Sequence, residues 1–193
     1  FMRPPPQTQP DIASIASLVE PGRFSETVAL IVGGTRGLGE VTAKAIAAGG
    51  GEVIITYNQG RIEARKIQAE ISSQGGKCRI YQLDATKSPR TLSNIFKRHQ
   101  NISSFYYFAT TKISGRRRGL FDAKLVEEFI IIYATYFSKA LEIILGQNRV
   151  FTVFYPSSIT IDENPKELAE YVIAKKAAED ICAYYSKFSN QLN

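Results

Sequence analysis

Residues 28–39 read Val-Ala-Leu-Ile-Val-Gly-Gly-Thr-Arg-Gly-Leu-Gly. The apolar run 28–32 predicts a buried parallel strand, and the stretch 39–48 predicts a helix. Glycines between them allow a tight turn and let a ligand approach the backbone closely. A helix N-terminus presents unpaired N–H groups and the positive end of a dipole, so this stretch predicts a phosphate-binding turn.

Strands and helices alternate along the chain after residue 27. The predicted strands are 28–32, 52–57, 78–83, 104–109 and 149–155, and the predicted helices are 37–48, 60–73, 88–99, 122–145 and 165–188. This alternation predicts an α/β fold with a parallel sheet between helices. Residues 1–11 contain four prolines and 12–20 have a short helical pattern, so we expect a linker plus helix over 1–26. One dinucleotide-binding domain is then expected over 27–193.

Composition excludes several classes of protein. The two cysteines, Cys78 and Cys182, stand in no CxxC or Cys/His spacing, so a disulfide scaffold or a zinc site is not expected. Reduced thiols predict a cytoplasmic protein. No apolar run approaches the roughly 20 residues of a membrane span. The net charge of +6, partly from Arg116–Arg118 and Lys175–Lys176, suits solvated faces or an anionic ligand, and no nucleic-acid motif is present.

Ligands of parallel sheets bind at the carboxyl ends of the strands, so the loops after the strands carry the next candidates. Arg36 lies within the glycine turn, where its guanidinium can meet a phosphate. Tyr57 and Asn58 follow the second strand, where an NAD site places an acidic residue for the ribose hydroxyls. The pattern therefore favours NADP(H) over NAD(H), although an exposed turn residue without a ligand is the alternative for Arg36.

The loops after the third and fourth strands are less specific. Asp84 and Ala85 follow the third strand, and Asp84 is either an acceptor for an adenine amino group or the cap of the helix near Pro89. Ala109 and Thr110 follow the fourth strand and are small enough for a cofactor to approach.

A second constellation lies near the end of the chain. Tyr171 and Lys175 are four residues apart, so a helix places both on one face. An ammonium beside a phenol stabilises the phenolate, which makes the tyrosine a proton donor and acceptor near neutral pH. Ser158 would hydrogen-bond the substrate oxygen. The alternative is a chance spacing in which Tyr171 only packs.

These motifs together resemble the short-chain dehydrogenase/reductase (SDR) family over about residues 25–190. Its TGxxxGxG pattern is matched by Gly33, Gly37 and Gly39, with Val32 for the threonine. Its YxxxK motif is matched by Tyr171 to Lys175, and Ser158 stands thirteen residues before Tyr171, as in the family. The resemblance implies a doubly wound Rossmann-type sheet of strand order 3-2-1-4-5.

The resemblance also implies roles for individual residues. Tyr171 would be the proton donor, Ser158 would orient the carbonyl, and Lys175 would hold the nicotinamide ribose. The cofactor-binding residues would be Gly33, Thr35, Arg36, Gly37, Leu38, Gly39, Tyr57, Asn58, Asp84, Ala85, Ala109, Tyr171 and Lys175.

The chain departs from the family pattern at three places. Residues 107–110 replace the family's NNAG and retain only Ala109. Tyr133 stands where many members have an asparagine that supports a proton-relay water. The sequence given ends at Asn193, before the two strands, Pro-Gly turn and substrate lid that family members add, so we expect none of them here.

The leading hypothesis is NADPH-dependent reduction of a carbonyl, either a ketone or a 3-oxoacyl group on an acidic carrier protein. The alternative is a catalytically impaired nucleotide-binding module with a sensing or structural role. We also expect a homodimer or homo-oligomer through the helices 122–145 and 165–188. Residues 129–137 crowd apolar side chains onto more than one face of the first helix, and SDR relatives pair these helices.

Overall fold

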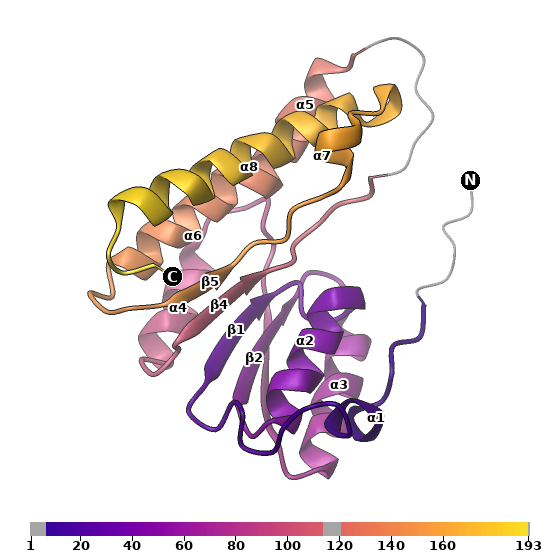
Figure 1. Ribbon diagram of the computed structural model, residues 1–193, viewed down its shortest axis with the longest axis vertical. Helices are drawn as coiled ribbons and strands as arrows, with labels where there is room; N and C mark the ends of the chain where they lie inside the picture. The colour runs from indigo at the N-terminus through magenta and orange to yellow at the C-terminus, as the bar shows by residue number, and fades with distance from the viewer. Residues whose placement is uncertain (1–6, 114–120, 193) are drawn as a thin grey trace. The chain divides into compact units, whose positions relative to one another are not determined.

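The computed structural model describes residues 7–113 and 121–192, which form two compact units (Figure 1). The first unit contains the residues up to Asp84 together with Phe96–Phe108. The second contains Ala85–Ile95 and the residues from Ala109 onward. The basic run Arg116–Arg118 lies outside the described residues.

The first unit begins the alternation of strands and helices predicted above. Its elements are α1 (Ile12–Ala16), β1 (Val28–Val32), α2 (Gly37–Ala48), β2 (Glu52–Tyr57), α3 (Arg61–Ser73), β3 (Lys77–Gln82) and β4 (Ser104–Tyr107). Strand β1 pairs in parallel with both β2 and β4, which places Leu30 opposite Ile54 and Phe105. All three side chains are buried, as the continuous apolar strands predict.

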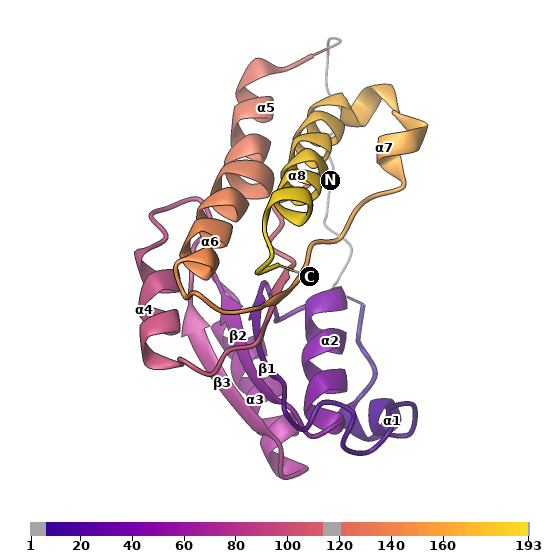
Figure 2. The ribbon, with the colours of Figure 1, turned by 60° about the vertical axis from the view of Figure 1, so that its left-hand side comes forward.

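The second unit is mostly helical. Its elements are α5 (Ala123–Ile130), η1 (Ile131–Thr135), α6 (Tyr136–Leu145), β5 (Thr152–Phe154), α7 (Thr160–Glu163), η2 (Lys166–Leu168) and α8 (Ala169–Phe188). The boundary between the units falls within α4 (Arg90–Arg98). Figure 2 shows α8 running beside α5 and α6.

The strand order of the sheet is β3-β2-β1-β4-β5. This confirms the α/β, Rossmann-type fold class and the order that the family resemblance implied. In addition, Leu192 forms an isolated parallel bridge with Phe151, whose N–H donates to the Gln191 carbonyl at 2.8 Å. This single bridge is not a strand, and no strand follows α8 within the described residues.

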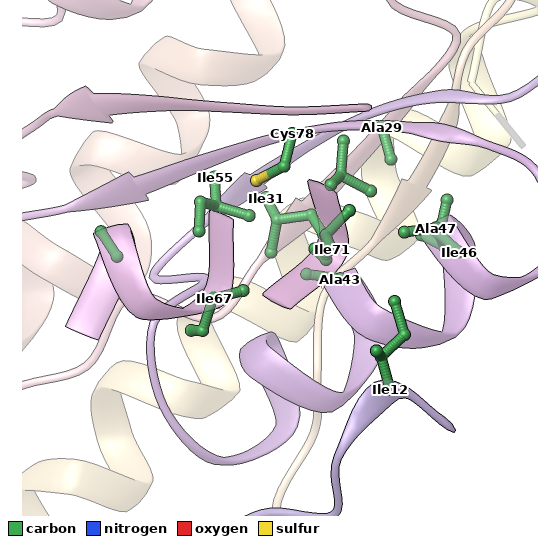
Figure 3. Packing of buried hydrophobic residues seen from close by; sticks show 12 residues of the cluster. Ile12, Ala29, Ile31, Ala43, Ile46, Ala47, Ile55, Ile67, Ile71 and Cys78 are labelled. Carbon is green, nitrogen blue, oxygen red and sulfur yellow. The ribbon is translucent and has the colours of Figure 1, made fainter. Parts of the chain in front are cut away.

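A hydrophobic cluster holds α2 and α3 against the sheet (Figure 3). Side chains two apart on a strand lie on one face of the sheet, and side chains three or four apart on a helix lie on one side of the helix. The apolar face of the sheet therefore packs against the apolar sides of α2 and α3. The fully or nearly buried members are Ile12, Ala29, Ile31, Ala43, Ile46, Ala47, Val53, Ile55, Ala64, Ile67, Ile71 and Cys78. This packing fixes where α2 begins, and with it the glycine turn.

Charged groups hold the N-terminal segment to the same helices. The Lys44 ammonium, only 3% exposed, contacts the Glu40 and Glu70 carboxylates at 2.8 and 3.0 Å. It also donates to the Pro10 carbonyl at 2.9 Å, and the Ile12 N–H donates to Glu70 at 2.7 Å. The end of the segment predicted as a linker is thus part of the packed unit, while residues 1–6 lie outside the described residues.

The predicted helix 122–145 is not one regular α-helix, because η1 is a π-helical turn between α5 and α6. Buried residues recur every four positions here: Phe129, Tyr133, Phe137 and Leu141. In an α-helix that spacing drifts by about 40° at each step. A wider turn offsets the drift, so the π-turn keeps these side chains on the buried side.

The remaining differences are at element ends. The final helix starts at Ala169 after a short 3₁₀ turn, and β5 covers three residues of the predicted 149–155. No helix within residues 7–113 and 121–192 is both long enough and apolar enough to cross a membrane.

Candidate functional site

The glycine turn of the first unit forms as the sequence predicts. Gly33 has φ +82°, a conformation that favours glycine. A Cβ on Gly39 would lie 2.4 Å from the Gly33 carbonyl oxygen, so only glycine fits there. The N–H groups of Gly33 and Gly34 donate to the side chain and the backbone carbonyl of Thr56 at 3.3 and 3.2 Å. The turn is therefore tied to β2 and held close to the start of α2.

The start of α2 suits an anion. Arg36 precedes the helix in extended conformation, and its side chain makes no capping hydrogen bond to the first turn. The first backbone N–H groups of this twelve-residue helix therefore receive no side-chain acceptor from the cap position. Together with the positive end of the helix dipole, they fit the pyrophosphate of a dinucleotide.

Arg36 itself has a partner that sequence reasoning missed. Its guanidinium contacts the Glu63 carboxylate at 3.0 Å, and both side chains are just over two-fifths exposed. Glu63 lies in the first turn of α3. A hydrogen bond from its own backbone N–H and the Arg36 guanidinium hold the pKa of Glu63 below its usual value. Glu63 lies beyond the loop directly after β2, where the sequence analysis considered an acidic residue.

The other predicted residues of this unit flank the turn. The side chain of Thr35 is buried, whereas Leu38 is 68% exposed. The carbonyl of Tyr57 accepts the Leu83 N–H at 2.8 Å, and the carbonyl of Asn58 accepts the Gln82 side-chain amide at 3.1 Å.

Asp84 follows β3 in an irregular segment, but α4 begins only at Arg90, directly after Pro89. Asp84 is therefore not the cap of that helix. Ala85 and Ala109 belong to the second unit.

In the second unit, Tyr171 and Lys175 lie one turn apart on α8, and both are buried. The Tyr171 ring meets the rings of Phe129 and Tyr133 edge to face, at centroid distances of 6.0 and 5.3 Å. Two aromatic side chains, one from α5 and one from η1, therefore fix the orientation of the Tyr171 ring.

The Lys175 ammonium is held by groups that carry no negative charge. It donates a hydrogen bond to the Pro156 carbonyl and lies 4.1 Å from the centroid of the Tyr155 ring. Burial lowers the pKa of Lys175 from 10.5 to about 8, although Glu179 and Cys182 on the same helix act in the opposite direction. Lys175 is thus a buried cation that exchanges its proton near neutral pH.

Two tyrosines that the sequence did not assign complete this cluster. The Tyr155 hydroxyl donates to the Tyr133 carbonyl, within the π-turn, at 3.1 Å. The Tyr133 hydroxyl lies 2.6 Å from the Thr110 hydroxyl. Burial raises the pKa of both tyrosines, so both stay protonated at neutral pH. The four-residue apolar spacing around Tyr133 is the sequence signal that could have predicted the widened turn; the sequence analysis predicted a single helix instead.

Ser158 lies between β5 and α7, two residues before the first residue of α7. Its hydroxyl lies 2.8 Å from the Thr160 hydroxyl. The neighbouring Ser157 hydroxyl donates to Glu179 on α8. The segment after β5 therefore provides both the hydroxyl of Ser158 and, through Pro156, the acceptor for Lys175.

The match to a known protein family covers the glycine turn but not the motif of Tyr171 and Lys175. The family model described as short chain dehydrogenase matches residues 27–132. A curated 3-oxoacyl-[acyl-carrier-protein] reductase from Synechocystis is 38% identical over 61 residues, which are 32% of this chain. The match spans a quarter of that reductase's length.

Solved structures show the same fold. The FolM alternative dihydrofolate reductase 1 from Brucella suis, in complex with NADP, has a TM-score of 0.77 at 16% identity, covering 88% of this chain and 70% of that one. A 3-oxoacyl (acyl-carrier-protein) reductase from Agrobacterium tumefaciens with NADP bound has a TM-score of 0.75 at 18% identity, covering 89% and 69%. Because the family model matches more than half of the sequence, the chain belongs to the short-chain dehydrogenase family.

Proposed function

We propose that this protein is an NADP(H)-dependent reductase of a carbonyl group. In this proposal the glycine turn and the start of α2 bind the pyrophosphate of the nucleotide, Arg36 binds its 2′-phosphate, and Asp84 contacts its adenine. The uncapped start of α2 and the fit of Gly33 and Gly39 support it. The two solved structures named above carry NADP according to their descriptions, which agrees with this choice.

The observation that carries the chemistry is the buried pair of Tyr171 and Lys175 on α8. When bound, NADPH supplies a hydride to the carbonyl carbon of the substrate. Tyr171 donates a proton to the carbonyl oxygen, which completes an alcohol, and Ser158 orients that oxygen by a hydrogen bond. Lys175 holds the nicotinamide ribose, and its ammonium favours the tyrosinate that proton transfer leaves.

For the substrate we propose a ketone or a 3-oxoacyl thioester. The curated relative is described as acting on a 3-oxoacyl group of a carrier protein. The net charge of +6, which includes Arg116–Arg118, would attract an acidic carrier.

The test begins with titration by NADPH and NADH, followed by NADPH consumption with acetoacetyl thioesters and simple ketones. We expect tighter binding of NADPH and turnover that Tyr171→Phe abolishes without weakening nucleotide binding. Tyr184→Phe is the matched control, because Tyr184 lies on the same helix but is 62% exposed. Nucleotide binding without turnover on any carbonyl would instead favour a sensing or structural module.

We also infer self-association through α5, α6 and α8. The chain itself buries Ile132, Tyr133, Tyr136 and Phe137, so these side chains are not available to a partner. Ile131 and Ile173 remain 37% and 42% exposed and are the side chains we assign to the interface. Light scattering should give twice the chain mass, and Ile131→Glu should give a monomer; a monomer for the unsubstituted chain would exclude the interface.

A further inference from the structure

The contact between Arg36 and Glu63 has a consequence for nucleotide selection. Glu63 is the acidic partner of the arginine that the proposed function assigns to the 2′-phosphate, at 3.0 Å. Its carboxylate also lies close to the glycine turn. A Cβ on Gly60 would be 3.2 Å from a Glu63 carboxylate oxygen and 3.4 Å from the Thr35 hydroxyl. The negative charge therefore sits beside the turn.

Two anions then compete for one guanidinium. Arginine binds carboxylate and phosphate through the same planar set of N–H donors, so Arg36 cannot give its full set of hydrogen bonds to both. A 2′-phosphate close to Arg36 would also be repelled by the Glu63 carboxylate. A nucleotide with a free 2′-hydroxyl brings no second anion to this position, and a carboxylate can accept a hydrogen bond from that hydroxyl.

We propose that Glu63 is a cofactor-specificity residue, which holds Arg36 and thereby weakens binding of the 2′-phosphorylated nucleotide relative to the unphosphorylated one. This inference rests on the proposed function, because it assumes that Arg36 meets the 2′-phosphate. Arg36 makes the protein prefer NADPH over NADH, and Glu63 reduces the size of that preference.

The size of the effect follows from the exposure of the pair. An ion pair between half-exposed side chains has a modest strength, because water screens it. Releasing Arg36 by Glu63→Gln should therefore tighten NADPH binding by roughly three- to five-fold. NADH binding should change by less than about two-fold, because the amide oxygen of glutamine remains an acceptor for the 2′-hydroxyl and the site is exposed to water.

The chain offers a matched control in the first unit. Glu52 contacts Arg79 at 2.9 Å, also at the surface, but this pair joins the starts of β2 and β3 rather than the glycine turn. Glu52→Gln removes the same charge from a similar pair. It should leave the ratio of NADPH to NADH affinity unchanged, which separates a local effect from the change in net charge.

The experiment measures dissociation constants for NADPH and NADH, by fluorescence titration of the full chain, in the parent and four variants. The variants are Glu63→Gln, Arg36→Ala, the double variant and Glu52→Gln. Competition for the guanidinium predicts that Glu63→Gln gains much less NADPH affinity in the Arg36→Ala background. An equal gain in both backgrounds would assign the effect to direct repulsion and overturn the proposal that Glu63 acts by holding Arg36.

The remaining outcomes separate the two proposals. If Arg36→Ala weakens NADPH binding but Glu63→Gln leaves it unchanged or weakens it, the role of Glu63 is refuted and the proposed function stands. If the parent binds both nucleotides equally, or neither, the assignment of Arg36 fails and the role of Glu63 fails with it.

Discussion

Lys175 should destabilise the protein at neutral pH, and replacing it by methionine should stabilise the fold. Burial lowers the pKa of this lysine from 10.5 to about 8. At about 1.4 kcal/mol for each tenfold change, the charge costs about 3 kcal/mol of folding free energy at pH 7. Methionine fills a similar volume without the charge, but it leaves the Pro156 carbonyl without this donor, which costs about 1 kcal/mol. The expected net gain is about 2 kcal/mol.

The pH dependence of the stability shows whether the buried charge of Lys175 causes the difference between parent and variant. Between pH 8 and 10.5 the unfolded chain keeps the proton on Lys175 while the folded chain has lost it. The unfolded state therefore binds more protons, and the stability of the parent rises with pH over this window. Most of the advantage of Lys175→Met should have disappeared by pH 10.

The assay is urea unfolding of the parent and the variant at pH 7 and pH 10. Lys44→Met is the matched control, because Lys44 is equally buried but contacts Glu40 and Glu70. Burial alone would lower the pKa of Lys44, yet hydrogen bonds and charges from those carboxylates raise it overall. The free energy of unfolding of Lys44→Met should be about 2 kcal/mol lower than that of the parent at both pH values. A Lys175→Met variant that is less stable than the parent at pH 7 would refute the reasoning.

Three further predictions concern the packing around the site. Gly39→Ala should lower the free energy of unfolding by about 1–3 kcal/mol and prevent nucleotide binding, because the Cβ of the alanine would overlap the Gly33 carbonyl oxygen. Unchanged nucleotide binding in a titration would contradict the geometry of the turn. Tyr155→Phe should lower the free energy of unfolding by about 1 kcal/mol, because the π-turn loses a hydrogen bond while the ring beside Lys175 stays; an unchanged urea midpoint would argue against that bond. Ile12→Ala should lower the free energy of unfolding by about 2 kcal/mol, whereas Leu18→Ala, at a side chain 85% exposed, should leave it almost unchanged. Equal urea midpoints for the two variants would show that the N-terminal segment does not pack against the first unit.

Local patterns in the sequence predicted the parts of this protein that depend on neighbours along the chain. The glycine turn, its strand and its helix follow from residues 28–48, since φ angles and apolar spacing are local properties. The pairing of Tyr171 with Lys175 on one side of a helix follows from their spacing alone. The strand order came from resemblance to a family, and the structure confirms it.

The tertiary structure decided the properties that depend on groups distant in sequence. Glu63 is the partner of Arg36 because α3 packs beside the glycine turn. The residues directly after β2 give no indication of this contact. Lys175 and Lys44 are both lysines on helices, yet the pKa of one falls and that of the other rises. The charge of a buried lysine depends on whether carboxylates or neutral groups surround it. Glu40 lies on the same helix as Lys44, but Glu70 comes from α3, and the Pro156 carbonyl and the Tyr155 ring come from outside α8. Tertiary packing therefore decides much of the difference between the two lysines.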